Sequence, residues 1–455
     1  MDFDRRAFLA AAAASVVAGA PARAATGQIL RPEDFGARGD GTTNDSRAFA
    51  ALSEEVNRRG GGTISLGAKL TYIVGDQTLG PKSGWVPAPL LDLHDLSTPL
   101  KIIGNGARIR CQAGLRFGTF EPGTGEPVKR KMPNFQRDEV ASPYRGLIWL
   151  KNCRASIEVR DVELDGSLEA LRIGGQFGDT GWQIPATGLL LEGNLAEEII
   201  ENVYSHHHGQ DGAILIGDPQ RTARTRIRRL VSRYNGRQGL SITGGRGFDL
   251  EDCEFSHSGR SAINSAPGAG VDIEAEGKPI RDVSFTRCKF VDNAGVGMVA
   301  DSGDSEGARF NDCLFVGTTT WSAWPLKPRF RFDHCTFVGS VVHPFPNSDP
   351  NRATQFTDCR FTDDPKLSPN GKVFLGGGPI VNLAESENVL FDRCTFDLVD
   401  QGVLPWSWHA TYRDCTMKQR SKQTAMTKGK YLGTTTISAP VFSDARVVTA
   451  RTISS

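Results

Sequence analysis

The C-terminal half of the chain repeats one pattern of apolar and polar positions. Each unit has an apolar residue, two polar residues, a cysteine, one further residue and then an aromatic residue or Met. The seven copies centre on Cys253, Cys288, Cys313, Cys335, Cys359, Cys394 and Cys415. Positions two apart share one face of a strand, but the step of three before each cysteine breaks that alternation. The pattern therefore predicts two short strands joined by a tight bend, with every apolar residue turned inward.

The spacing of the copies indicates a solenoid. Successive cysteines are separated by 35, 25, 22, 24, 35 and 21 residues, and such a unit buries its inner face only by stacking on its neighbours. We expect an all-β chain folded as a right-handed parallel β-helix. A β-sandwich of hairpins is the alternative, and it is disfavoured because the repeats lack the Asn-Gly or Asp-Gly turns of hairpins.

The charge balance argues against nucleic-acid binding. The 455 residues contain 53 basic and 52 acidic side chains without a long basic block. Residues 1–24 have the features of a signal peptide, with Arg5-Arg6 before an alanine-rich apolar run and Ala22-Arg23-Ala24 as a cleavage site. The paired arginines favour the twin-arginine route over ordinary secretion. The run is short for a membrane span, so we expect a periplasmic or secreted protein.

The nine cysteines are expected to be reduced. Seven occupy the same inward position of successive coils, about 4.8 Å apart, where parallel side chains seldom offer the torsion of a disulfide. Buried thiols can act there as small hydrophobic groups.

The N-terminal stretch resembles a known family. Asp34-Phe35-Gly36-Ala37, Gly39-Asp40-Gly41 and Asp45 are followed by a helical pattern over 46–59 and by Gly60-Gly61-Gly62-Thr63-Ile64. This opening is similar to that of pectate-lyase-superfamily β-helix proteins, which include rhamnogalacturonases, polygalacturonase-like hydrolases and phage tailspikes. The resemblance implies a β-helix and action on sugar polymers. The polygalacturonase and pectate-lyase catalytic motifs are absent, so it implies no residue roles.

The domain boundaries follow from these patterns. Residues 25–66 are expected to form an N-terminal cap and the first strand, with the helix covering the open end of the solenoid. Residues 67–420 would form the β-helix and 421–455 a C-terminal cap. Two polar insertions, 117–145 and 166–186, are candidate walls of a cleft or plain solvated loops.

One predicted strand carries alternating acids. Asp272, Glu274 and Glu276 on residues 271–276 would project from one face, with Asp211 at a strand entry nearby. Aligned coils place His207, Tyr234 and His257 in one corner column, with Arg237 and Arg260 close by. The acids can serve as acid and base, or Asp272, Glu274 and Glu276 as Ca²⁺ ligands; no cofactor is certain. Histidines suit proton transfer and arginines suit a substrate carboxylate. The alternative is a solvated acidic face.

Four tryptophans complete the candidate site. Trp321 and Trp324, and Trp406 and Trp408, are expected on the acidic face, where they could stack on sugar rings or instead cover loops. The leading hypothesis is an exported enzyme that cleaves an acidic, uronate-containing polysaccharide, with β-elimination slightly ahead of hydrolysis. Catalysis would involve Asp272, Glu274, His257, Arg237, Arg260, Asp211 and His207. A non-catalytic polysaccharide-binding β-helix is the hypothesis from a different class.

Overall fold

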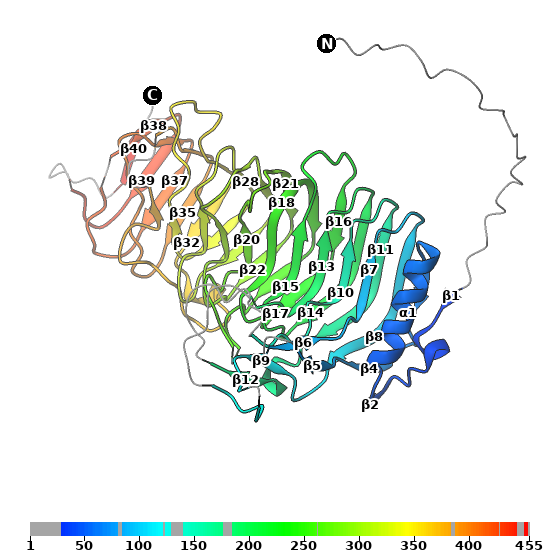
Figure 1. Cartoon of the computed structure of the whole chain (residues 1–455). Helices are drawn as coiled ribbons and strands as arrows, with labels where there is room; N and C mark the ends of the chain where they lie inside the picture. Colours follow the sequence, from blue (N-terminus) through cyan, green and yellow to red (C-terminus); the bar gives the residue numbers. More distant parts are fainter. Residues whose placement is uncertain are drawn as a thin grey trace, which may run out of the picture.

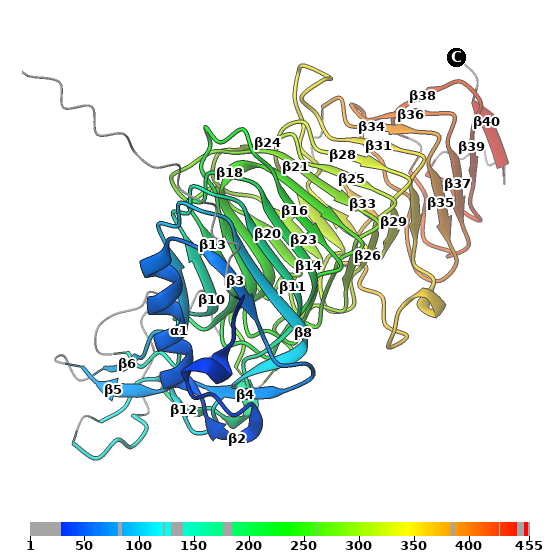
Figure 2. The same cartoon turned by 90° about the vertical axis from the view of Figure 1, so that its right-hand side faces the viewer.

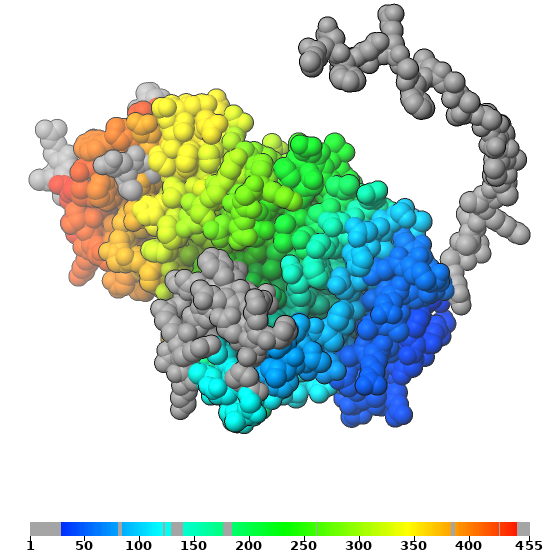
Figure 3. Space-filling model, in the orientation of Figure 1, coloured from blue at the N-terminus to red at the C-terminus, as the bar shows by residue number. Residues whose placement is uncertain are grey.

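The cysteine and phenylalanine repeats form the coils of a parallel β-helix, which confirms the predicted fold class. In this computed structural model the described residues are 29–80, 84–121, 123–128, 140–175, 184–261, 263–383, 387–426, 428–443 and 450–453. The signal segment predicted at 1–24 lies outside them. Figure 1 shows the coils stacked along one axis, from α1 at one end to β39 and β40 at the other. The colour bands of Figure 3 follow the same order.

Each coil contributes strands to three sheet faces. The first sheet faces the candidate site and contains β7 (Leu91–His94), β10 (Gly146–Lys151), β13 (Thr187–Glu192), β15 (Asp211–Ile216), the first part of β18 (Gln238–Glu251), β20 (Val271–Ile273), β23 (Met298–Ala300), β27 (Ala323–Pro325), β30 (Val341–Val342) and β33 (Val381–Asn382).

The second sheet follows the first in every coil. It contains β3 (Gly62–Ser65), β8 (Leu100–Cys111), β11 (Ile157–Asp165), β14 (Glu198–His206), β16 (Thr225–Arg228), the end of β18, β21 (Ile280–Thr286), β25 (Arg309–Asn311), β28 (Arg331–Asp333), β31 (Gln355–Thr357), β34 (Leu390–Asp392), β36 (Thr411–Arg413) and β38 (Lys430–Leu432).

The third sheet begins after the cysteine corner. It contains β4 (Thr71–Val74), the ends of β8, β11 and β14, and then β17 (Val231–Arg233), β19 (Glu254–Ser256), β22 (Lys289–Val291), β26 (Leu314–Val316), β29 (Thr336–Val338), β32 (Arg360–Thr362), β35 (Thr395–Leu398), β37 (Thr416–Gln419) and β39 (Thr435–Ser438).

Smaller elements lie at the ends and in the loops. They are α1 (Ser46–Arg59), β1 (Ile29–Leu30), β2 (Asp40–Asn44), β5 (Gln77–Leu79), β6 (Trp85–Pro87), β9 (Arg116–Gly118), β12 (Arg172–Gly174), β24 (Ser305–Glu306), β40 (Ala450–Ile453) and the 3₁₀ turns η1 (Pro32–Phe35), η2 (Leu168–Ala170) and η3 (Pro365–Leu367).

The predicted bend lies directly before each cysteine. Asp252, for example, has φ +56°, and the residue before each of the other six repeat cysteines is also left-handed. A left-handed non-glycine residue costs about 1–2 kcal/mol. The backbone N–H of Asp252 is satisfied by the Thr286 carbonyl of the next coil at 3.0 Å. The corner thus turns the chain while it keeps the inter-coil hydrogen bonds.

Stacked aromatic rings fill the inside of the corner. Phe310 and Phe332 lie 4.8 Å apart between centroids with planes 11° apart, and Phe315 and Phe337 repeat the arrangement at 4.8 Å and 7°. Such pairs contribute about 0.5–1.5 kcal/mol beyond area burial. All nine cysteines are free and buried, and Cys335 Sγ lies 3.3 Å from the Phe310 carbonyl oxygen of the preceding coil. The expectation of reduced thiols therefore agrees with the structure.

Helix α1 caps the N-terminal end, as predicted (Figures 1 and 2). Phe49, Leu52 and Val56 are fully buried, and Asn57 Nδ2 donates to the Asp92 carbonyl of β7 at 2.9 Å. The helix therefore covers the first coil with an apolar stripe and a polar anchor. In the described part of the chain, no helix combines the length and apolar character needed to cross a membrane.

Candidate functional site

The predicted row of three exposed acids does not form. Strand β20 ends at Ile273, and the three acids differ in environment: Asp272 is buried, Glu274 is half-buried and Glu276 is exposed. Asp272 is only 6% exposed, and its Oδ2 accepts a hydrogen bond from Gln238 Nε2 at 2.7 Å. Glu274 Oε1 instead accepts from Ser302 Oγ at 2.6 Å. The strand is thus three residues long rather than the predicted six, although Glu274 N and Glu276 N still donate to the Ile242 and Thr243 carbonyl oxygens of β18 at 3.1 and 2.9 Å.

The acids are also not gathered as a shared calcium site would require. Among the described residues, carboxylate and imidazole ligand atoms lie within 4.8 Å of one another in two other clusters, Glu163–Asp165–His206 and Asp333–His334–Asp358. Asp272, Glu274 and Glu276 do not form such a cluster. The expectation of Ca²⁺ at these three residues therefore gains no support from their positions.

A surface cavity of about 240 Å³ lies on the first sheet beside Asp272. Its carboxyl groups come from Asp211 and Glu276, and its guanidinium groups come from Arg145 and Arg237. The remaining lining residues are Pro185, Thr187, Leu190, Gln210, Ile214, Ile216, Ser241 and Thr243. Arg145 is the last residue of the insertion 117–145, and Pro185 belongs to the insertion 166–186. Both insertions thus supply part of the cavity wall, which agrees with the prediction that they are walls of a cleft.

Asp211 is the most deeply placed acid of the cavity. It opens β15, is fully buried, and accepts a hydrogen bond on Oδ2 from Ser241 Oγ at 2.7 Å. Its Oδ1 has no hydrogen-bond partner among the described residues. Burial raises the pKa of Asp211 to about 6, although Arg237, 3.9 Å away, opposes the rise. Asp211 therefore holds a proton more readily than an ordinary aspartate.

Hydrogen bonds link Asp211 to Asp272 through Ser241 and Gln238. Ser241 Oγ is within hydrogen-bond range of both Asp211 Oδ2 and Gln238 Oε1, and Gln238 Nε2 donates to Asp272. Ser241 has one proton, and the amide oxygen can only accept. The single proton of Ser241 can therefore serve Asp211 or Gln238, but not both at once. Burial raises the pKa of Asp211, whereas the hydrogen bond from Ser241 opposes the rise.

Asp272 is the second acid with a strongly raised pKa. Burial and the neighbouring Glu274 raise the pKa of Asp272 to about 7, whereas Arg237 and the Gln238 hydrogen bond oppose the rise. It pairs in register with Ser241 on the preceding coil, as the sequence alignment of coils predicted. The site therefore contains two carboxyl groups that titrate near neutral pH, with Arg237 close to both.

The predicted corner column exists, but outside this cavity. His207 stacks on Tyr234 at 5.3 Å between centroids, and Tyr234 stacks on His257 at 4.6 Å. All three have left-handed φ of +54° to +58°, which brings them to equivalent corners. Both faces of Tyr234 are covered, so its edge and hydroxyl alone remain for a sugar. Burial lowers the pKa of His207 and His257.

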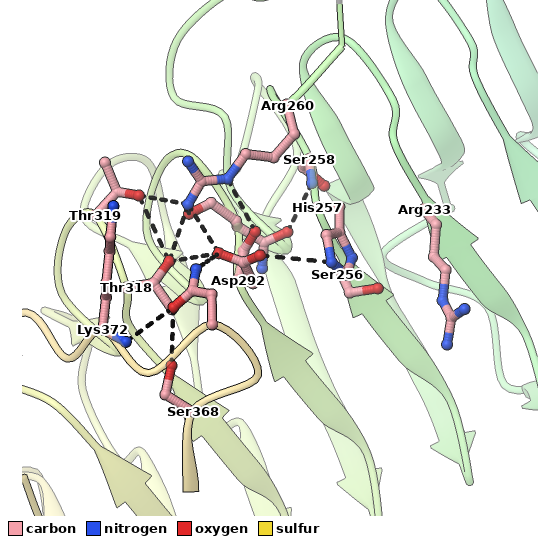
Figure 4. A network of polar contacts seen from close by, with 12 residues as sticks. Arg233, Ser256, His257, Ser258, Arg260, Asp292, Thr318, Thr319, Ser368 and Lys372 are labelled. Carbon is pink, nitrogen blue, oxygen red and sulfur yellow. Dashed lines mark hydrogen bonds and ion pairs between the residues drawn. The ribbon is translucent and has the colours of Figure 1, made fainter. Parts of the chain in front are cut away.

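His257 and Arg260 belong to a separate polar network (Figure 4). His257 Nε2 lies 3.5 Å from Asp292 Oδ2, and Arg260 Nη2 lies 2.9 Å from Asp292 Oδ1. Arg260 also donates to Thr318 Oγ1 at 2.9 Å. The long loop after His257 carries Arg260 toward Asp292 on the next coil. His257 and Arg260 thus share Asp292 as their acidic partner, where Asp272 was expected, and neither lines the cavity of Asp211.

The two tryptophan pairs differ in their relation to the site. Trp324 pairs with Val299, which pairs with Asp272, so it lies two coils or about 10 Å along the first sheet. Trp321 packs edge-on against it at 5.4 Å. Trp406 and Trp408 lie on a much later coil with exposed fractions of 37% and 64%. The first pair adjoins the acidic region, and the second lies beyond it.

Sequence reasoning missed Gln210 and Arg145, which line the cavity, and Gln238, which links Ser241 to Asp272. Gln210 and Gln238 stand directly before and at strand entries, and Gln238 pairs in register with Asp211. The available signal for Gln238 was its position directly before Gly239, which aligns with that of Asp211 before Gly212. Arg145 gave no such signal, because the insertion before it has no counterpart in other coils.

Comparison with known proteins gives structural likeness alone. No family model and no curated sequence matches the chain. The mannuronan C-5 epimerase AlgE4 A-module of Azotobacter vinelandii is 14% identical, with a TM-score of 0.44 over 92% of this chain and 100% of that one. The tailspike gp49 of Acinetobacter baumannii bacteriophage Fri1, a capsular polysaccharide depolymerase, is 12% identical, with a TM-score of 0.45 over 93% of this chain and 65% of that one. The N-terminal fragment of bacteriophage Phi29 gene product 12 is 13% identical, with a TM-score of 0.49 over 90% of this chain and 66% of that one.

These likenesses leave the chemistry to be argued from this chain's own residues. The architecture itself is clear, since successive coils pair in parallel register through all three sheets from β3 to β39. The chain has the parallel β-helix that its resemblance to the pectate-lyase superfamily implied.

Proposed function

We propose that this protein cleaves an acidic polysaccharide at the cavity containing Asp211, Glu276 and Arg237, by hydrolysis of a glycosidic bond. The observation that carries the proposal is the pair of carboxyl groups in one cavity, the buried Asp211, whose pKa is raised to about 6, and the exposed Glu276. Glycoside hydrolysis needs one carboxylic acid to protonate the leaving oxygen and one carboxylate to activate water or attack the sugar. Asp211 is the acid in this scheme.

Glu276 is the second carboxyl group of the scheme. It lines the same cavity as Asp211 and is exposed, so a water molecule or a sugar can reach it. Asp272 lies behind Gln238 and acts as a positioning residue, because its carboxylate orients the amide that in turn orients Ser241. Arg237 lies near the acids and supplies a cation that is complementary to an anionic substrate.

The acidic substrate class is supported by the two guanidinium groups of the cavity. Arg145 and Arg237 both line it, and guanidinium groups bind carboxylates with paired hydrogen bonds. The same two groups support β-elimination as the second candidate, since a cation that neutralises a uronate carboxylate acidifies the neighbouring carbon-bound proton. Hydrolysis is placed ahead of elimination because the cavity contains two carboxyl groups, Asp211 and Glu276, which is the set that hydrolysis requires.

The experiment is an assay on a set of uronate-containing polymers. New reducing ends without ultraviolet absorbance of an unsaturated uronate would support hydrolysis, whereas that absorbance would establish elimination. Asp211→Asn should lower kcat by about 10²–10⁴. The matched control is Asp312→Asn, an exposed corner residue with φ +53°, where Asn is well tolerated. Binding of a polymer without any cleavage would overturn the proposal in favour of a binding protein.

A further inference from the structure

The outer surface of the second sheet carries ordered ion pairs between coils. Lys101 Nζ on β8 lies 3.4 Å from Glu158 Oε2 on β11, and Arg228 Nε on β16 lies 2.9 Å from Glu251 Oε2 on β18. Opposite charges therefore meet across neighbouring strands. Such cross-strand pairs stabilise a sheet, whereas like charges directly opposite destabilise it.

Arg309 and Arg331 depart from this arrangement. They are direct partners in the parallel register of β25 and β28, about 4.8 Å apart along the stack. Their outer neighbours on the same line are uncharged, Ser284 on one side and Gln355 on the other. In the part of the chain that the structure describes, neither guanidinium group has an ion pair with a carboxylate. Two like charges thus face each other without a counter-charge in the sheet.

Arg331 is held in place by backbone carbonyl oxygens. Its Nη1 donates to the Ala353 carbonyl at 2.7 Å and to the Phe330 carbonyl at 3.0 Å. These neutral acceptors fix the direction of the guanidinium group but do not cancel its charge. Arg309, in contrast, is exposed, so one guanidinium is rigid and the other is free to close on a ligand.

A surface cavity of about 430 Å³ opens at this pair. Its lining includes Arg309 and Arg331 together with two acids, Asp282 and Glu306. Asp282 is engaged by Arg224 at 2.6 Å.

Glu306 is engaged as well. It lies 3.1 Å from Arg329 and 3.6 Å from Arg352. With both acids of the cavity committed to other arginines, the charge of Arg309 and Arg331 is left over.

We propose that Arg309 and Arg331 form a binding site for an oxyanion: a carboxylate, sulfate or phosphate group. Two neighbouring guanidinium groups offer paired donors that match the oxygens of such a group. The bound anion would remove the repulsion between the two strands. The site lies on the second sheet, in the line of β21, β25 and β28 (Figure 2), whereas the cavity of Asp211 lies on the first, so it does not depend on the proposed catalytic activity.

Calorimetric titration with inorganic sulfate, inorganic phosphate and galacturonate tests the site at constant ionic strength set with chloride. We expect saturable binding to the wild-type chain and at least about tenfold weaker binding to Arg309→Gln, the loss expected for one charge-assisted hydrogen bond. The order of affinity among the three probes distinguishes a carboxylate site from a sulfate or phosphate site. Arg228→Gln, which removes an ion-paired arginine from the same sheet, should bind like the wild type.

Thermal unfolding provides the second measurement. At low salt, Arg309→Gln should have a higher Tm than the wild type because the repulsion is gone. Sulfate is excluded from protein surfaces in general and should raise the Tm of both proteins equally by that effect. Binding at the arginine pair should add a further rise in the Tm of the wild type alone. Equal stabilisation of the two proteins by sulfate, or undiminished affinity of Arg309→Gln for all three probes, would overturn the proposal.

Discussion

Ser241 Oγ lies 2.7 Å from Asp211 Oδ2, although the two residues are 30 positions apart in the chain. The parallel register of β15 and β18 creates this contact. A second register, between β18 and β20, places Asp272 beside Ser241. Three successive coils thus assemble one hydrogen-bonded unit with two acids whose pKa values are raised to about 6 and about 7.

Replacement of Arg237 should move the pH dependence of activity upward. Arg237 lowers the pKa of both Asp211 and Asp272 against the effect of burial, so Arg237→Gln should raise both values. We expect the pH profile of kcat/KM to shift to higher pH and KM for an anionic polymer to increase. Arg228→Gln, on the second sheet, should leave the profile unchanged. An unshifted pH profile in Arg237→Gln would show that Arg237 does not influence the pKa values of the groups that control activity.

Asp272 should make the folded state less stable as the pH rises. Its pKa of about 7 in the folded protein lies above the ordinary aspartate pKa of about 3.9, so the folded state binds the proton more tightly than the unfolded chain does. This contribution is full below pH 4 and is lost as the pH rises through about 7, with an upper limit of about 4 kcal/mol. The unfolding free energy of Asp272→Asn, measured by denaturant titration, should therefore increase relative to that of the wild type as the pH rises from 5 to 8. A constant difference across that range would contradict the shifted pKa.

The thiols should resist modification until the protein unfolds. All nine cysteines are buried and free, so a reagent cannot reach their sulfur atoms while the coils are folded. A thiol reagent at pH 8 should therefore label none of them in the native protein and all nine in denaturant. A reductant should leave the Tm unchanged, because no disulfide is present to cleave. Fewer than nine reactive thiols in denaturant without reductant would indicate a disulfide.

Truncation of one stacked ring should weaken the whole solenoid. Phe332 packs between Phe310 and Phe356 at 4.8 and 5.0 Å between centroids. Phe332→Ala should lower the unfolding free energy by about 3–5 kcal/mol through lost burial and a cavity. Denaturant titration measures the loss, and Thr336→Ala, at a half-buried position of the same coil, should lie close to the wild type. A cost below about 1 kcal/mol for Phe332→Ala would mean that the core closes around the gap.

The repeat could be read from the sequence because it is governed by local chemistry. The step of three between Phe332 and Cys335 admits no straight strand, so a bend was required, and the structure places His334 there with φ +51°. The identical step in seven coils then implied stacking in register. The helix over Phe49, Leu52 and Val56 followed in the same way from its own spacing.

The site could be read only in part. Asp211 and Asp272 were singled out by position, and the coil alignment placed Asp272 beside Ser241. Glu274 lies near Asp272 as expected, but it accepts a hydrogen bond from Ser302 and does not line the cavity, which its sequence position did not reveal. Arg260 was misplaced because a loop of varying length carries it to Asp292 on the next coil.

The sequence alone determined the coil, its inward residues and its reduced thiols, since each depends on spacing within one repeat. The tertiary structure decided which side chains meet between coils, because loop lengths and strand ends set the register there. It also decided their chemistry: burial raises the pKa of Asp211 and Asp272, and burial is a property of the assembled stack.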